Sequence, residues 1–213
     1  MLKNTHDSNR IYKYIFKVIL ISVGLAFIGL GVALMHKSSL GTSAIDTLCN
    51  GISRQLGVSL GTSSFIVYII LFIPCIIFAR DTIRTGTLLA TFTQGFYINF
   101  FYNLIPDIAG YEITWLKYLF SLIGVLLCSF GISFYVSVKE GLGPLEGVTE
   151  VFISKLKWSY KRSKTATDLI LLFFGLILGG VYGPGTLINV LCIGRLIQFF
   201  LKRMNIYFRR VLT

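Results

Sequence analysis

The stretch GTLLATFTQGFYINFF, Gly86 to Phe101, has a counterpart near the end of the chain in GTLINVLCIGRLIQFF, Gly185 to Phe200. The two align without a gap, and seven of sixteen positions are identical. Earlier in each half, LGTSAIDTLCNGISRQL aligns with LGPLEGVTEVFISKL when the first is allowed two extra residues after its glycine. That alignment matches Asp46 with Glu146. Self-similarity of this kind indicates that the chain consists of two related halves.

The composition is that of an integral membrane protein. Hydrophobic residues make up 54% of the 213 residues, aromatic residues 15%, and the mean hydropathy is +0.76, which exceeds what a soluble domain of this size needs. Apolar runs of about 17 to 25 residues can cross a membrane as helices. The sequence therefore predicts an all-α, polytopic protein with six transmembrane helices: Tyr14 to Met35, Leu60 to Ala79, Gly86 to Leu104, Ile113 to Val138, Thr165 to Tyr182, and Gly185 to Leu201.

Each half contains three of these spans and one short segment after the first span. Because three is odd, the second copy is inserted upside down relative to the first. This inverted pattern occurs in many secondary transporters, and also in channels and in proteins with no transport role. The expected divisions are a tail over 1–12, a first repeat over 13–104, an external loop over 105–112, a second repeat over 113–204, and a basic tail over 205–213.

The net charge of +11 is informative through its distribution. With six spans and a cytoplasmic N-terminus, the segments outside the cell contain only three lysine or arginine residues, Lys37, Arg54 and Lys117. The positive-inside rule therefore predicts a multi-pass cell-membrane protein with both termini cytoplasmic. The basic run KLKWSYKRSK, Lys155 to Lys164, is then a topology determinant, with binding of anionic lipid headgroups as the alternative. We expect the lipid bilayer as a partner and no nucleic acid.

The short segments after the first span of each half have helical amphipathic periodicity but are too short to cross a membrane. They either lie in the interface or enter the protein interior as re-entrant helices. Pro144, after Gly143, suits a first helical turn. Asp46 and Glu146 lie near the helix starts, where they could cap free amides or bind a cation, a proton or a cationic group of a substrate.

The motifs LGTSAIDTL, LGVSLGTSSFIV, GLGPLEG, KTATD and GLILGGVYGPGTLINVLCIG resemble those of the YczE/YyaS/YitT group of bacterial membrane proteins, over about Leu20 to Phe200 and most closely in the YczE-like branch. The resemblance implies membership and no particular activity. Ala44 stands where members of this group often have a proline. Lys164 and Asp168 stand where the pattern of the group resembles Arg-x-x-x-Glu. The structural residues expected within these motifs are Gly41, Thr42, Gly86, Gly143, Pro144, Gly183 and Gly185.

Charged and polar residues inside the predicted spans mark a candidate site. Arg195 lies about ten residues into the last span, and we expect it to join Lys164 and Asp168 in a charge cluster. The alternative is that Arg195 reaches the headgroups and Asp168 pairs with Lys164 alone. Gln94 and Asn189 add polar groups in the last span of each half, either along a central path or as hydrogen-bond partners of neighbouring helices.

The sequence contains no HExxH, no Cys/His cluster and no P-loop. We therefore expect no metal site, no cofactor and no enzymatic activity. The leading hypothesis is a small transporter or permease-like protein that binds a small solute, a lipid headgroup or a coupling ion at the polar residues named above. The alternative is a non-transporting accessory or scaffold protein that docks a partner. The oligomeric state is not indicated.

Overall fold

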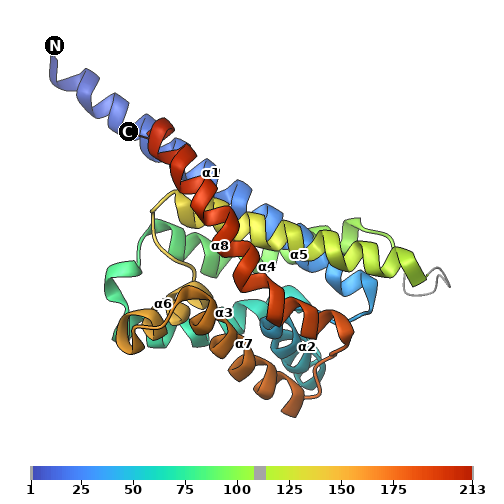
Figure 1. Ribbon diagram of the computed structural model, residues 1–213. Helices are drawn as coiled ribbons and strands as arrows, with labels where there is room; N and C mark the ends of the chain where they lie inside the picture. Colours follow the sequence, from blue (N-terminus) through green and yellow to red (C-terminus); the bar gives the residue numbers. More distant parts are fainter. Residues whose placement is uncertain (1, 108–113, 213) are drawn as a thin grey trace.

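The computed structural model describes the backbone of residues 2–107 and 114–212, and the side chains of 11–107 and 115–208. This part of the chain is all-helical and contains no strand, which confirms the predicted class (Figure 1). The elements are α1 (Leu2–Ser38), α2 (Ala44–Leu56), α3 (Leu60–Phe78), η1 (Arg80–Thr82), α4 (Thr85–Leu104), α5 (Thr114–Ser137), α6 (Pro144–Leu156), α7 (Tyr160–Ile177) and α8 (Pro184–Leu212). Most of the loop expected over 105–112 lies outside the described residues.

Four helices are long and apolar enough to cross a membrane: Ile11–Ser38, Leu60–Phe78, Trp115–Ser137 and Pro184–Phe208. They correspond to four of the six predicted spans. The other two correspond to α4 and α7, which have 20 and 18 residues and are thus about as long as α3, but are less apolar than the four spans. The predicted fifth span, Thr165 to Tyr182, starts and ends too late in the chain. Helix α7 begins at Tyr160 and ends at Ile177, and Gly179 follows it with a φ of 75°.

The antiparallel pair α1 and α5 forms the long axis of the molecule, and glycines allow the two helices to touch (Figure 1). A methyl group at Gly31 would lie 2.6 Å from the carbonyl oxygen of Gly124, and one at Gly131 would lie 2.6 Å from that of Gly24. Real side chains do not tolerate such distances. The helix backbones are therefore in direct contact at two places.

The remaining helices pack in corresponding pairs around this axis. Helix α4 packs on α1, and α8 packs on α5. The short helix α2 packs on α7 of the other half, and the short helix α6 packs on α3. In Figure 1 the two short helices lie toward opposite ends of the molecule.

The loops that precede the short helices are joined to the opposite half by backbone hydrogen bonds. The amide of Gly185, at the start of α8, donates to the carbonyl of Leu40 at 2.8 Å. The amide of Gly86, at the start of α4, donates to the carbonyl of Glu140 at 2.6 Å. Each loop thus shares a bond with the first turn of a helix from the other half.

The two loops also have the same backbone conformation. The φ angles are 57° at Ser39 and 61° at Lys139, then 98° at Gly41 and 104° at Gly141. Positive φ favours glycine, which explains the glycine in each loop. Both short helices then begin three residues later, α2 at Ala44 and α6 at Pro144, so the predicted start of α6 is confirmed.

We predict that Gly31→Ala destabilises the protein, because the new methyl group would collide with the α5 backbone at 2.6 Å. Overpacking of this kind costs about 1–3 kcal/mol. Gly194→Ala is the matched control, since its methyl group would meet its nearest neighbour at an ordinary 3.7 Å and gain helix propensity. Thermal unfolding in detergent measures both. Equal melting temperatures for the two variants would contradict the close α1–α5 contact.

Candidate functional site

A cavity of about 40 Å³ lies in the interior. All eight α-helices or the loops before them contribute to its lining. A buried water needs roughly 10–15 Å³ of such space, so the cavity holds only a few water-sized particles. Most of the wall is apolar, and the polar side chains in it are Ser43, Asp46, Tyr68, Gln94, Tyr135, Glu146 and Lys164.

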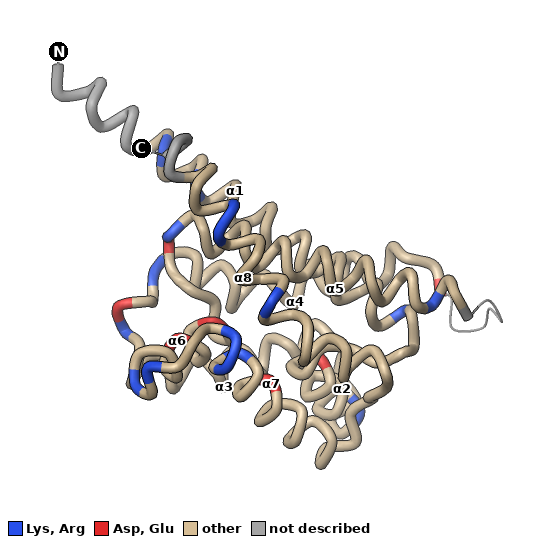
Figure 2. Tube along the Cα trace, in the orientation of Figure 1, with Lys and Arg blue, Asp and Glu red and all other residues tan. Residues whose placement is uncertain are grey.

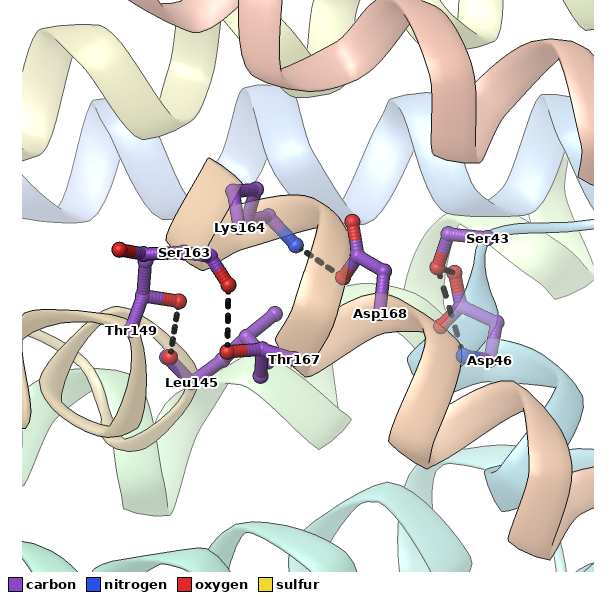
Figure 3. A network of polar contacts seen from close by, with 8 residues as sticks. All are labelled: Ser43, Asp46, Leu145, Thr149, Ser163, Lys164, Thr167 and Asp168. Carbon is purple, nitrogen blue, oxygen red and sulfur yellow. Dashed lines mark hydrogen bonds and ion pairs between the residues drawn. The ribbon is translucent and has the colours of Figure 1, made fainter. Parts of the chain in front are cut away.

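Asp46 enters the cavity from the first turn of α2. Its backbone amide donates to Ser43 Oγ at 3.3 Å, and Ser43 Oγ–H donates in a short hydrogen bond to the Asp46 carboxylate (Figure 3). Ser43 is the N-cap, so this is a local capping arrangement. Asp46 thus takes part in the start of α2, as one of the two alternatives from the sequence predicted, and it also lines the cavity.

Glu146 enters the same cavity from the first turn of α6. The N-cap there is Gly143, which has no side chain to donate. The donor is instead Tyr135 of α5, whose hydroxyl donates to Glu146 Oε2 at 2.5 Å and accepts from the Gly143 amide at 3.1 Å. The two carboxylates therefore face one shared space, each held by one hydroxyl group.

Both carboxylates lie on helices outside the four long apolar spans. Burial raises the pKa of Asp46 to about 6, against the opposing effect of the hydrogen bond from Ser43. Burial likewise raises the pKa of Glu146, against the hydrogen bond from Tyr135. A carboxyl group with a pKa near 6 exchanges its proton close to neutral pH.

Lys164 and Asp168 form an ion pair on one face of α7, as expected from their spacing (Figure 3). Both side chains are only 3% exposed. The Lys164 ammonium also lines the cavity. The second carboxylate oxygen of Asp168, Oδ2, is buried without a hydrogen-bond partner among the described residues.

Arg195 does not join this pair, and the expectation of a three-membered charge cluster was wrong on this point. On α8 the residue that faces α7 is Gly194, where a methyl group would lie 3.7 Å from Lys164 Cβ. Successive helical residues are rotated by about 100°. Arg195 is consequently exposed, and it lines a groove of about 510 Å³ between α5 and α8.

Gln94 and Asn189 have different surroundings although both are 1% exposed. Gln94 lines the cavity, and neither its Oε1 nor its Nε2 has a hydrogen-bond partner among the described residues. Asn189 is not part of the cavity lining and donates to Met35 Sδ at 3.5 Å. Of the two amides, only Gln94 lies in the cavity.

The motif glycines serve the backbone contacts between the halves. A methyl group at Gly183 would lie 2.3 Å from the Leu40 carbonyl, and Gly86 and Gly185 donate the two loop hydrogen bonds. Thr42, next to Gly41, is buried, and its hydroxyl has no partner among the described residues.

Sequence reasoning missed Ser43, Tyr68 and Tyr135. Ser43 carried a signal, because a serine three residues before an acidic residue is typical of a helix start. The two tyrosines carried none, since an isolated tyrosine in an apolar helix is equally compatible with an interfacial position.

We predict that Lys164→Met lowers the free energy of unfolding by roughly 3–5 kcal/mol, because it leaves the buried Asp168 carboxylate unpaired. The double variant Lys164→Met with Asp168→Leu should recover most of this loss. The matched control is Lys17→Met, which breaks a more exposed pair with Glu140 at 2.7 Å and should cost at most about 1 kcal/mol. Denaturant titration in detergent measures all three, and a double variant no better than Lys164→Met would argue against pairing.

The chain is similar to proteins of Bacillus subtilis and Haemophilus influenzae. It is 28% identical over 181 residues to "Uncharacterized membrane protein YczE" of Bacillus subtilis (strain 168), which covers 84% of this chain and 83% of YczE. "Uncharacterized protein YyaS" of the same organism is 26% identical, with 87% and 92% covered. A Haemophilus influenzae protein, "Uncharacterized protein", is 28% identical, with 84% and 80% covered. No solved structure matches the chain.

The same region of the chain matches a protein-family model. Residues 15–202 match the "Family of unknown function (DUF6198)". That region includes the residues that line the cavity, the two short helices and most of the four apolar helices. The protein is therefore a multi-pass membrane protein related to YczE and YyaS, and it belongs to the DUF6198 family.

Proposed function

We propose that the protein is a small permease-like transporter whose binding site is the cavity between the first turns of α2 and α6. One observation carries the proposal: Asp46 and Glu146, from opposite halves of the chain, meet in one enclosed interior space with the unpartnered amide of Gln94. Buried polar groups without partners are rare where they have no role. Small-molecule sites commonly combine an apolar wall with a few convergent polar groups.

We further propose that 13–104 and 113–204 are inverted repeats of three spans each, with α4 as the third crossing and α7 as the fifth. The matching loop angles, the reciprocal bonds from Gly185 and Gly86, and the corresponding packing of α2 on α7 and α6 on α3 support this arrangement. In transporters built this way, the site lies between the repeats. Here the cavity lies between the starts of the two short helices.

This arrangement offers a path to each side of the membrane. Helices α2 and α6 both begin at the cavity and extend toward opposite ends of the molecule (Figure 1). Movement of α2 with α7 would open the cavity toward one end, and movement of α6 with α3 toward the other. The glycine contacts of α1 with α5 would form the fixed axis between these movements.

The alternative is an accessory or scaffold protein that docks a membrane partner or headgroups without transport. It is favoured by exposed Leu156 and Trp158, which lie beside Lys155 and Lys157 at the end of α6. Figure 2 shows Lys and Arg gathered at this end of the molecule. An exposed apolar patch among basic residues is typical of a surface that meets lipid or another protein.

We predict that the C-terminal ends of α2 and α6 face opposite sides of the membrane, with both chain termini cytoplasmic. Arg54 and Lys155, both exposed there, become single labelling sites as Arg54→Cys and Lys155→Cys in a background without the four native cysteines. A membrane-impermeant thiol reagent added to intact cells should label Cys at 54 and spare Cys at 155, and inverted vesicles should give the reverse. Labelling of both from one side would contradict the inverted repeat.

We predict that the purified protein transports a small solute into liposomes. Uptake should fall at least tenfold in the variants Asp46→Asn and Glu146→Gln, because the loss of a charged hydrogen-bonded contact costs roughly 1.5–3 kcal/mol. The matched control is Glu150→Gln, one turn further along α6 and outside the cavity lining. Uptake is measured for a panel of amino acids, choline and alkali cations. Equal uptake by folded Asp46→Asn, Glu146→Gln and wild type would contradict the site, and a co-purifying partner with no uptake would favour the accessory role.

A further inference from the structure

We propose that the cavity binds one small monovalent cation of alkali-ion or ammonium size at Asp46, Glu146 and Gln94. This inference rests on the proposed function in taking the cavity as the binding site. It goes further because it selects a substrate or coupling-ion class and sets aside larger solutes and lipid headgroups.

The first argument is charge. The cavity and its immediate wall contain three carboxylates, Asp46, Glu146 and Asp168, and one ammonium, Lys164, all of them buried. If all are ionised, three negative charges and one positive charge leave two uncompensated negative charges. Isolated charges in a low-dielectric interior are strongly unfavourable. Two protons, or one proton and one monovalent cation, make the site neutral.

The second argument is the supply of oxygen ligands. Ser43 donates a hydroxyl hydrogen to the Asp46 carboxylate, and Tyr135 donates one to the Glu146 carboxylate. Each carboxylate is thus held in position while it acts as a hydrogen-bond acceptor. Gln94 contributes an amide oxygen that has no donor among the described residues. Carboxylate and amide oxygens are the ligands of hard cations. The two acidic side chains and Gln94 are thus the three groups that we assign to the ion.

The third argument is size. A volume of about 40 Å³ leaves room for an ion with one or two waters, and not for an amino acid or a headgroup. Mg²⁺ and Ca²⁺ require six or more oxygen ligands at short distances, and Mg²⁺ usually keeps several waters. With three assigned ligands and little space for water, a monovalent ion is the better fit.

A carboxyl group must lose its proton before it ligates an ion, so protons compete with the ion for the site. Asp46 interacts electrostatically with Lys164 and Asp168 of α7, and Glu146 interacts with the same two residues and accepts a hydrogen bond from Tyr135 of α5. The other titratable groups that interact with Asp46 or Glu146 are Cys49, Tyr68, Cys75, Cys128 and Tyr160. A protonated carboxyl group cannot ligate the ion through its occupied oxygen. Ion binding should therefore release a proton and weaken as the pH falls.

The test measures the melting temperature of the full-length protein in detergent against the concentration of NaCl, KCl or NH₄Cl, with choline chloride holding ionic strength constant. A ligand that binds the native state raises the melting temperature in a saturable way. We expect saturable stabilisation by at least one of the three ions relative to choline. Its half-saturation concentration should rise about tenfold for each pH unit below the pKa of the competing group.

The key variant is Gln94→Leu, which removes a ligand without altering a charge or a helix cap. It should raise the half-saturation concentration about tenfold, while Asp46→Asn should abolish the ion effect. Glu150→Gln, outside the cavity lining, should leave it unchanged. Because Asp46 also takes part in the cap of α2, Gln94→Leu keeps the test valid if Asp46→Asn folds poorly.

Identical melting curves in choline and in all three salts at about pH 8, or stabilisation by Mg²⁺ alone, would overturn the cation site. Half-saturation that is unaffected by Gln94→Leu would do the same. Cation binding without flux in liposomes would overturn the transport function and leave the cation site standing. Uptake of a larger solute without cation binding would overturn the cation site and leave the transport function standing.

Discussion

The structure depends on the direct contact between the backbones of α1 and α5. Side chains larger than hydrogen at Gly24, Gly31, Gly124 and Gly131 would separate these helices. Their approach brings Tyr135 of α5 within reach of Glu146, and Leu25, Ile28 and Val32 of α1 into the wall of the same cavity. The candidate site therefore exists because two helices lack side chains where they cross.

The buried charged side chains around the cavity each have a partner, either close by in the sequence or on a neighbouring helix. Lys164 has Asp168 one turn away, Asp46 has Ser43 at its own cap, and Glu146 has Tyr135. Among the uncharged polar side chains, the hydroxyls of Thr42 and Ser163 and the amide of Gln94 have no hydrogen-bond partner among the described residues, and of these Gln94 lines the cavity. A ligand beside this amide and the two carboxylates would supply contacts that the protein itself does not make there.

Local sequence rules predicted the local features. The start of α6 at Pro144 follows from the fixed φ of proline, and the Lys164–Asp168 pair follows from helical spacing. The rules failed where a residue's direction depends on packing. Arg195 was placed on the wrong face, because it is Gly194 that lies against α7, and Arg195 is exposed. Nothing local to Tyr135 shows that its hydroxyl replaces a missing cap on another helix.

The reciprocal loop bonds have a consequence for biogenesis. The carbonyl of Leu40 receives its hydrogen bond from Gly185, which the ribosome adds long after Leu40. At typical elongation rates the interval is on the order of ten seconds. During that time the first half is in the membrane with its loop incomplete and the contact face of α2 uncovered, because α7 is also still to come. The first half therefore completes its own packing only after the second half has been synthesised.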